Sequence, residues 1–422
     1  MQEYIGVKTR FLCDNERLIK TNEKQLPFVI EPASAEFSSV DFLQTFLSKH
    51  SADILSEIAG YGAILLRGFS IHSTKEFEKT VLAIQGMKGM SHLFMSEPGR
   101  ERVDGLEYIF HTNSKIKTGG ALHLGGFHTE NYYSPDVPNY IAFCCFHAAK
   151  LGGETGLINM ASVYEKLDIS LKKQLEKKSF FVSKWPLGVV ANRYQVNPEL
   201  VKKACNDFGL SLDEKNFVHM YKPSVLKHPI TNKKIIQANL CAELPAVNDE
   251  ILNYFMPDYK GLKWIVHKAA WKLIGYHRLR KLSLMLPALA RHPIKFLKMR
   301  KKMQQRMKQY TNNSAPRINS VFKKEDIKTL ASSMYESYAS FLWHKGDILL
   351  VDNLQVAHAG MPGKTTKKFP RKIRAMLCNP LKLSYSDATS GLQDANVLLH
   401  ETLGEVMHKL GGNKVERSGH PL

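Results

Sequence analysis

Two residues of the stretch FHTENYY, His128 and Glu130, have the types and the spacing of metal ligands. In a β-strand, residues i and i+2 point to the same face, so an extended segment would aim this imidazole and this carboxylate at one point. Such a pair is two-thirds of a facial triad of two histidines and one carboxylate, which holds non-haem Fe(II) and leaves coordination positions open. Only His128 among the seventeen histidines has an acid at the second following position. The alternative is a polar pair on a solvent-facing strand, because about one or two such pairs are expected by chance from this composition.

A second stretch, GDILLVDNLQVAHAGMPGKTTKKFPRKIRAML, contains a further candidate ligand and a cation. His358 ends a very apolar predicted strand, and Arg371 follows thirteen residues later at the start of the next one. A metal site of this kind needs a second histidine from a distant strand. An arginine beside it suits an anionic cosubstrate, because the planar guanidinium can grip a carboxylate with two hydrogen bonds. On its own, His358 is equally compatible with a structural histidine at a strand end.

Short predicted strands must bring these residues together. Strand-like runs are AILLRGF (63–69), LEYIF (106–110), GGFHTENYY (125–133), NYIAFCCFHAA (139–149) and KKIIQANLC (233–241), and helical spacing marks 37–60, 74–86, 324–344 and 393–410. Short strands with candidate ligands far apart in sequence favour a small antiparallel barrel, and a jelly roll gathers distant strands around one mouth. We therefore expect an α+β fold, with a double-stranded β-helix (jelly-roll) core, flanking helices and a long basic helical insertion.

At 422 residues the chain is long enough for one elaborated domain or two; it shows no internal repeats, and we expect one domain over 1–422. Its predicted parts are an N-terminal α/β part (1–115), the first part of the jelly roll with the histidine–glutamate pair (116–250), a basic helical insertion or lid (251–340), the strands with the distal His358 and Arg371 (341–385) and a C-terminal tail (386–422).

Composition points to a globular cytoplasmic protein. Hydrophobic residues make up 44% of the chain, and no apolar run reaches the ~18 residues of a membrane span. The N-terminus lacks the apolar core of a secretory signal. The six cysteines form no CxxC pair and are expected to be reduced thiols.

The formal net charge of +20 is concentrated in one segment, because 261–324 contains seventeen Lys or Arg and no Asp or Glu. Such a block favours anionic partners. Three readings stay open beside a helical lid with a solvated basic face: an acidic carrier protein or other anionic carrier of the substrate, an anionic membrane with a lipid-like substrate, and nucleic acid, for which no motif is present.

Together these motifs resemble the Fe(II)/2-oxoglutarate-dependent dioxygenases of the taurine dioxygenase and clavaminate synthase-like group. The resemblance rests on YGAILLRGF (61–69), GGFHTENYY, LGGETGLINM (151–160) and the GDILLVDNLQVAHAGMPG block with RKIRAM, in the family's order. It implies iron ligation by His128, Glu130 and His358. It also implies that Arg371 pairs with the distal carboxylate of 2-oxoglutarate and that Thr155 hydrogen-bonds to this cosubstrate.

The substrate contacts are less well defined by the resemblance. Many relatives hold an anionic substrate with a second arginine four residues after the first, whereas Arg374 follows Arg371 by three and would face the other side of a regular strand. A β-bulge would restore the direction, and a structural salt bridge is the alternative. Asn131 and Tyr132 directly follow Glu130 and are further candidates for the pocket wall.

The resemblance implies oxidative decarboxylation of 2-oxoglutarate with O2, coupled to hydroxylation of an unactivated C–H bond. The expected substrate is an amino-acid-like small metabolite, free or carrier-bound. Desaturation or cyclisation of a lipid-like or other anionic substrate at the same iron site is one alternative, and a cupin-like binding module without turnover is another. Family halogenases lack the carboxylate ligand, so Glu130 disfavours halogenation.

Overall fold

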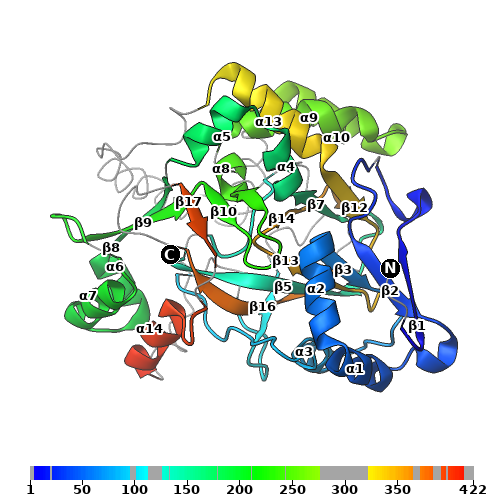
Figure 1. The fold of residues 1–422 in the computed structure, drawn as a ribbon, viewed down its shortest axis with the longest axis horizontal. Helices are drawn as coiled ribbons and strands as arrows, with labels where there is room; N and C mark the ends of the chain where they lie inside the picture. Colours follow the sequence, from blue (N-terminus) through cyan, green and yellow to red (C-terminus); the bar gives the residue numbers. More distant parts are fainter. Residues whose placement is uncertain are drawn as a thin grey trace, which may run out of the picture.

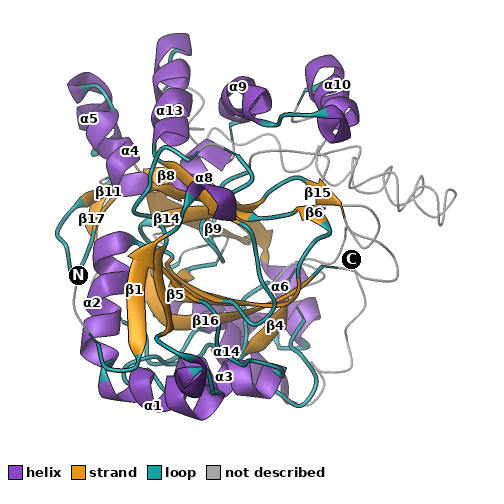
Figure 2. Ribbon diagram, turned by 90° about the vertical axis from the view of Figure 1, so that its right-hand side faces the viewer, coloured by secondary structure: helices purple, strands orange, loops and turns teal. Residues whose placement is uncertain are grey.

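Two β-sheets packed face to face form the centre of the molecule in this computed structural model, and helices cover their outer faces (Figure 1, Figure 2). The structure describes residues 4–19, 21–95, 101–112, 126–132, 134–177, 179–210, 212–242, 244–275, 322–364, 371–383, 391–395 and 398–412. Within these ranges no helix is both long enough and apolar enough to cross a lipid bilayer.

The large sheet has seven strands in the order β1-β2-β3-β13-β5-β16-β4. Their bounds are β1 Val7–Phe11, β2 Phe28–Pro32, β3 Ala63–Leu66, β4 Ile109–His111, β5 Asp136–His147, β13 Ile348–Asp352 and β16 Lys372–Lys382. Every neighbouring pair is antiparallel except β2 and β3. The strands from both halves of the chain therefore alternate across this sheet, as a jelly roll requires.

The facing sheet is small, with the order β12-β7-β14, and it carries the second half of the site. Its strands are β7 Thr155–Asn159, β12 Tyr338–Phe341 and β14 Val356–Gly360. The other short strands are β6 Leu151–Gly152 with β15 Gly363–Lys364, β8 Ser179–Pro186 with β9 Phe217–Pro223, and β10 Val225–Lys227 between β11 Lys234–Ile236 and β17 Leu392–Asp394.

A buried apolar core fills the space between the two sheets. Phe143 and Cys145 of β5 and Ile373 of β16 reach it from the large sheet, and Leu157 of β7 and Val356 of β14 reach it from the small one. Almost all of β5 is buried, because the α1–α3 side of the large sheet is also covered. This explains the continuous apolar run of NYIAFCCF, which a strand with one solvated face would not show.

Helices lie in two layers outside the sheets, and Figure 2 shows α1 and α3 on one side and α9, α10 and α13 on the other. The α-helices are α1 Val40–Lys49, α2 Ser51–Tyr61, α3 Thr74–Leu82, α4 Met160–Lys166, α5 Ile169–Leu175, α6 Leu187–Tyr194, α7 Pro198–Asp207, α8 Ala238–Ala242, α9 Pro245–Phe255, α10 Ile265–Ile274, α13 Lys324–Glu336 and α14 Leu403–Gly411. Short 3-10 helices are η1 Asp14–Glu16, η2 Ala35–Phe37, η3 Met256–Asp258 and η4 Leu262–Trp264.

The predicted α+β class is confirmed, and local predictions are wrong in two segments away from the candidate ligands. In KKIIQANLC only 234–236 are extended, and Ala238–Ala242 form α8. In 324–344 the helix ends at Glu336, and Tyr338–Phe341 pair with β7 instead. Short apolar runs do not distinguish a strand from a helix, so tertiary pairing decides both segments. Most of the predicted basic insertion, 276–321, lies outside the described residues.

Candidate active site

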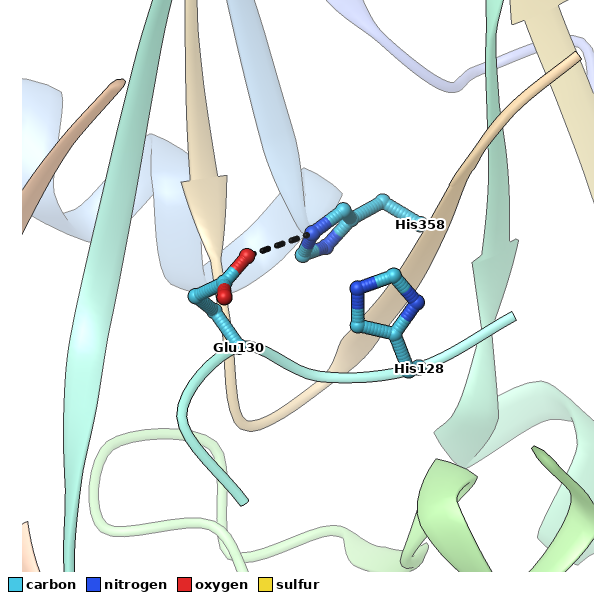
Figure 3. Close-up of side chains that lie close together, drawn as sticks. All are labelled: His128, Glu130 and His358. Atoms are coloured by element: carbon cyan, nitrogen blue, oxygen red, sulfur yellow. Dashed lines mark ion pairs between the residues drawn. The ribbon is translucent and has the colours of Figure 1, made fainter. Parts of the chain in front are cut away.

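His128, Glu130 and His358 converge at one end of the interior, as the sequence predicts for a metal site. One candidate ligand atom from each lies within 4.8 Å of those of the other two. Nε2 of His358 is 3.6 Å from Oε2 of Glu130. Figure 3 shows the three side chains pointing toward one another from two separate segments of the chain. Glu130 and His358 are 4% and 5% exposed, so the donors lie in a largely desolvated place.

A pair of backbone hydrogen bonds, not a regular strand, holds the two histidines together. The N–H of His128 donates to the carbonyl of His358 at 3.2 Å, and the reverse bond is 2.9 Å long. The chain then turns over residues 130–132, where Asn131 has a φ of 58°. The expectation that FHTENYY is a strand is therefore wrong, because the left-handed residue ends the extended segment directly after Glu130. The convergence itself is as predicted.

Asn353 fixes the turn that carries Glu130. Its Oδ1 accepts from the backbone N–H of Glu130 at 2.7 Å, and its Nδ2 donates to the carbonyl of Pro138 at 2.8 Å and to that of Glu130 at 3.4 Å. Asn353 is fully buried, so these bonds are not exchanged with water.

Asn239 of α8 holds the residue between the two ligands. Its Oδ1 accepts from the N–H of Thr129 at 3.2 Å, and its Nδ2 donates to the Thr129 hydroxyl at 2.8 Å. Sequence reasoning missed this residue, since it places Asn239 in a strand. Only the helical turn at 238–242 brings the amide to Thr129.

A buried pair supports the turn between β13 and β14, and thereby His358. Nε2 of His228 and Oδ2 of Asp352 are 2.7 Å apart, with both side chains 1% exposed. Nδ1 of His228 accepts backbone N–H groups of 230 and 231, so the proton lies on Nε2 and is donated to Asp352. Oδ1 of Asp352 accepts the N–H groups of 354 and 355. His228 carries no sequence signal for this role.

The side chain of His128 is oriented in a way that suits metal binding. Its Nδ1 lies 2.8 Å from the carbonyl oxygen of Gly126, which can only accept, so Nδ1 carries the proton. Nε2 is then the unprotonated ring nitrogen, which is the form that binds a metal. A histidine that binds a metal through one ring nitrogen is usually held in place by a hydrogen bond from its other ring nitrogen. His358 is held by packing instead, with its ring 5.2 Å from that of Phe143. Two imidazole nitrogens and a carboxylate fit Fe(II).

Thr155 and Arg371, the two residues predicted to bind the cosubstrate, lie next to the buried space between the two sheets. Thr155 begins β7, and its hydroxyl accepts from Nε1 of Trp343 at 3.1 Å. The guanidinium of Arg371 interacts electrostatically with Cys145 and Glu154, and burial lowers its pKa. Its Nε is buried and has no hydrogen-bond partner among the described residues. A half-buried cation with a buried N–H donor to spare suits a carboxylate ligand.

Glu154 is a buried acid beside this cation. It is 0% exposed, and neither carboxyl oxygen makes a hydrogen bond of normal geometry with the described residues. Burial raises the pKa of Glu154 to about 8, while nearby Arg371 and Ser340 oppose the rise. The acid therefore holds its proton at neutral pH. The LGGETG motif contains Glu154, but its burial is not readable from that motif.

The three residues predicted to contact the substrate are Arg374, Asn131 and Tyr132. Arg374 pairs with Cys144 and His111 and alternates with Ile373, whose side chain lies in the interior core. The register irregularity at 372/373 skips Phe146 of β5 and leaves the alternation along β16 unchanged, so Arg374 lies on the face opposite Ile373.

The other two lie in the turn after Glu130. Asn131 is 1% exposed, and its Nδ2 donates to the carbonyl of Asp136. Tyr132 is half-buried.

Comparison with known proteins places this site in a family. Residues 24–263 match the family described as "Taurine catabolism dioxygenase TauD, TfdA family". The match includes His128, Glu130 and Thr155 and ends before His358 and Arg371.

Individual relatives are more distant. The dapdiamide synthesis protein DdaC of Enterobacter agglomerans is 23% identical over 360 residues, which cover 83% of this chain and 90% of that protein. Among solved structures, PvcB of Pseudomonas aeruginosa is 12% identical with a TM-score of 0.44, covering 95% of this chain and 98% of that one. A taurine dioxygenase of Burkholderia xenovorans is 12% identical with a TM-score of 0.44, covering 97% and 100%. Since the family match covers more than half of its residues, this chain belongs to the TauD/TfdA family of Fe(II)- and 2-oxoglutarate-dependent dioxygenases.

Proposed function

We propose that this enzyme hydroxylates an unactivated C–H bond of an amino-acid-like or carrier-bound small metabolite, with His128, Glu130 and His358 as the iron ligands. The observation that carries the proposal is the convergence of these three donors from segments more than two hundred residues apart, within 4.8 Å of one another. Networks of buried hydrogen bonds to Asn353 and Asp352 hold both segments, as expected where ligand geometry must be fixed in advance.

In this proposal the side chains around the site have separate roles. The two imidazoles and the carboxylate would hold the iron, and a set of three protein ligands would leave coordination positions for 2-oxoglutarate and O2. Arg371 pairs with the distal carboxylate of 2-oxoglutarate, and the Thr155 hydroxyl, oriented by Trp343, hydrogen-bonds to the same molecule. The apolar core around Phe143 and Leu157 excludes water from the adjoining interior.

Bound iron supplies the oxidising chemistry, in which one O2 and one 2-oxoglutarate yield succinate, CO2 and a hydroxylated substrate. One oxygen atom enters succinate and the other enters the product. The carboxylate of Glu130 fills the position that a chloride would need, which supports hydroxylation over halogenation. The relative in dapdiamide synthesis supports a role in making a small metabolite, and it motivates amino acids and their amides as the first compounds to screen.

Succinate release tests the proposal. Anaerobically Fe(II)-loaded protein receives 2-oxoglutarate and O2 without prime substrate, beside His128→Ala and, as a matched control, His72→Ala, whose side chain is exposed before α3. We expect slow succinate formation in the parent and in His72→Ala, and none in His128→Ala. Stimulation of this rate then identifies substrates, and product analysis separates hydroxylation from desaturation or cyclisation.

The same experiment distinguishes a binding module from an enzyme. Anaerobic calorimetry that shows Fe(II) and 2-oxoglutarate binding with no succinate release would indicate a cupin-like module without turnover. If neither ligand binds, or if His128→Ala binds Fe(II) as tightly as the parent, the proposed ligand set is wrong.

A further inference from the structure

Helix α10, with the short η4 turn before it, has two apolar faces. The inner face consists of Trp264, His267 and Trp271, which are at most 3% exposed. Tyr259 packs edge-on against both tryptophans, with ring centroids 4.7 Å and 5.2 Å away. The inner face therefore belongs to the core of the protein.

Trp264 also fixes the helix next to the proposed cosubstrate residues. A Cβ on Gly152, in the β6–β15 pair, would lie 3.0 Å from the Trp264 ring. Gly152 precedes Glu154 and Thr155 in the LGGETG motif by only a few residues. The helix is thus anchored on one side to the edge of the site.

Among the described residues, no comparable side chains cover the outer face. Leu262, Ile265, Val266 and Leu273 are 85%, 55%, 72% and 81% exposed. Their spacing of three, four and eleven residues from Leu262 puts them on one side of a helix, opposite the buried tryptophans. Figures 1 and 2 both show α10 at the outer edge of the upper helical layer. Single exposed aliphatic residues are ordinary, whereas four on one helix face indicate an interaction surface.

Lysines flank this exposed stripe on both sides. At about 100° per residue, Lys263 lies on one flank, between the stripe and the buried face, and Lys268 and Lys272 lie on the other. No Asp or Glu occurs within η4 or α10 to offset these three lysines. The surface is therefore apolar along its centre and cationic at its borders.

We propose that the outer face of α10 docks on an anionic phospholipid bilayer. In that position the four aliphatic side chains enter the boundary of the acyl chains, and the lysine ammonium groups reach the lipid phosphates above them. Nucleic acid would neutralise the lysines but leave the aliphatic stripe in water. Symmetric pairing with a second copy would bring two lysine borders of the same sign together. This inference does not rest on the proposed iron chemistry.

Sedimentation of the full chain with lipid vesicles tests the inference. The vesicles contain phosphatidylcholine alone or with about 30% phosphatidylglycerol, the anionic component. The variant combines Leu262→Ser, Val266→Ser and Leu273→Ser. Its control combines Leu82→Ser, Leu200→Ser and Leu410→Ser, which are 38%, 46% and 42% exposed on α3, α7 and the end of α14. Both views place α3 and α14 on the side of the molecule opposite α10.

We expect the parent and the control to bind the anionic vesicles, and the α10 variant to bind at least about tenfold more weakly. Phosphatidylcholine alone should bind the parent much less. Lys263→Glu with Lys272→Glu keeps the stripe and should reduce the preference for phosphatidylglycerol. Circular dichroism checks that each variant is folded.

Several results would overturn the inference. One is equal vesicle binding by the α10 variant and the control, which would assign any binding to other basic residues. Another is a parent that does not bind anionic vesicles. A third is a parent that self-associates, or that binds an acidic acyl carrier protein in preference to vesicles, with the α10 variant losing that interaction instead.

Discussion

The carboxyl group of Glu154 should make the stability of this protein fall as the pH rises from 5 to 8. The group is 0% exposed and lies beside Arg371, the residue proposed to hold the cosubstrate. Burial raises its pKa to about 8, from an ordinary value of 4.5. The perturbation is Glu154→Gln, which keeps the shape of the side chain and removes the titrating proton.

The direction and the size of this change in stability follow from the numbers of protons that the folded and unfolded states bind. Above pH 4.5 the unfolded chain releases this proton, whereas the folded protein keeps it until about pH 8. The folded state thus binds more protons across this window, so raising the pH favours unfolding. Each pH unit over which the folded state holds this extra proton lowers the unfolding free energy by about 1.4 kcal/mol. Because the difference persists over most of the three units from pH 5 to pH 8, the total loss of unfolding free energy is about 3 kcal/mol.

Chemical denaturation at pH 5 and pH 8 measures the effect. The difference in unfolding free energy between Glu154→Gln and the parent should shift by about 3 kcal/mol in favour of the variant on going from pH 5 to pH 8. Glu214→Gln, at an exposed glutamate, is the control and should follow the parent at both pH values. Parallel pH dependence of the parent and Glu154→Gln would refute the reasoning, since Glu154 would then be ionised in the folded protein.

Three further substitutions test the supports of the site. Asn353→Ala removes the hydrogen bonds that hold the turn with Glu130, and it should raise the Fe(II) dissociation constant about tenfold to a hundredfold in an anaerobic titration. An unchanged affinity would show that the turn keeps its conformation without Asn353. His228→Ala leaves Asp352 buried without its partner and should lower the unfolding free energy by about 3 kcal/mol in urea, whereas a loss below about 1 kcal/mol would contradict a buried pair. Trp343→Phe removes the donor to Thr155 and should raise the KM for 2-oxoglutarate about fivefold with kcat unchanged, and an effect on kcat alone would argue against cosubstrate positioning.

Residue identity and order predicted the chemical class through the resemblance of four motifs to a known family. The pair of His128 and Glu130 alone is expected by chance from this composition, whereas its combination with the distal His358 and the Arg371 that follows it matches the order of the family's motifs. Apolar runs such as 63–66 and 139–146 also predict buried strands, since they lack the alternation of a half-exposed sheet. These features are local, so the sequence contains them directly.

The supports of the site were decided by tertiary structure. Asn239 acts on Thr129 only because the predicted strand becomes a helix, and His228 reaches Asp352 from 124 residues away. Glu130 lies between the backbone bridge at His128 and the left-handed residue Asn131, and no spacing rule distinguishes this arrangement from a strand. Burial likewise keeps the carboxyl group of Glu154 protonated, and it distinguishes the inner face of α10 from the outer one. Both effects depend on which distant segments pack over a side chain. The sequence by itself thus determined which groups are available for chemistry, and the packing of distant segments determined which of them meet and in what protonation state.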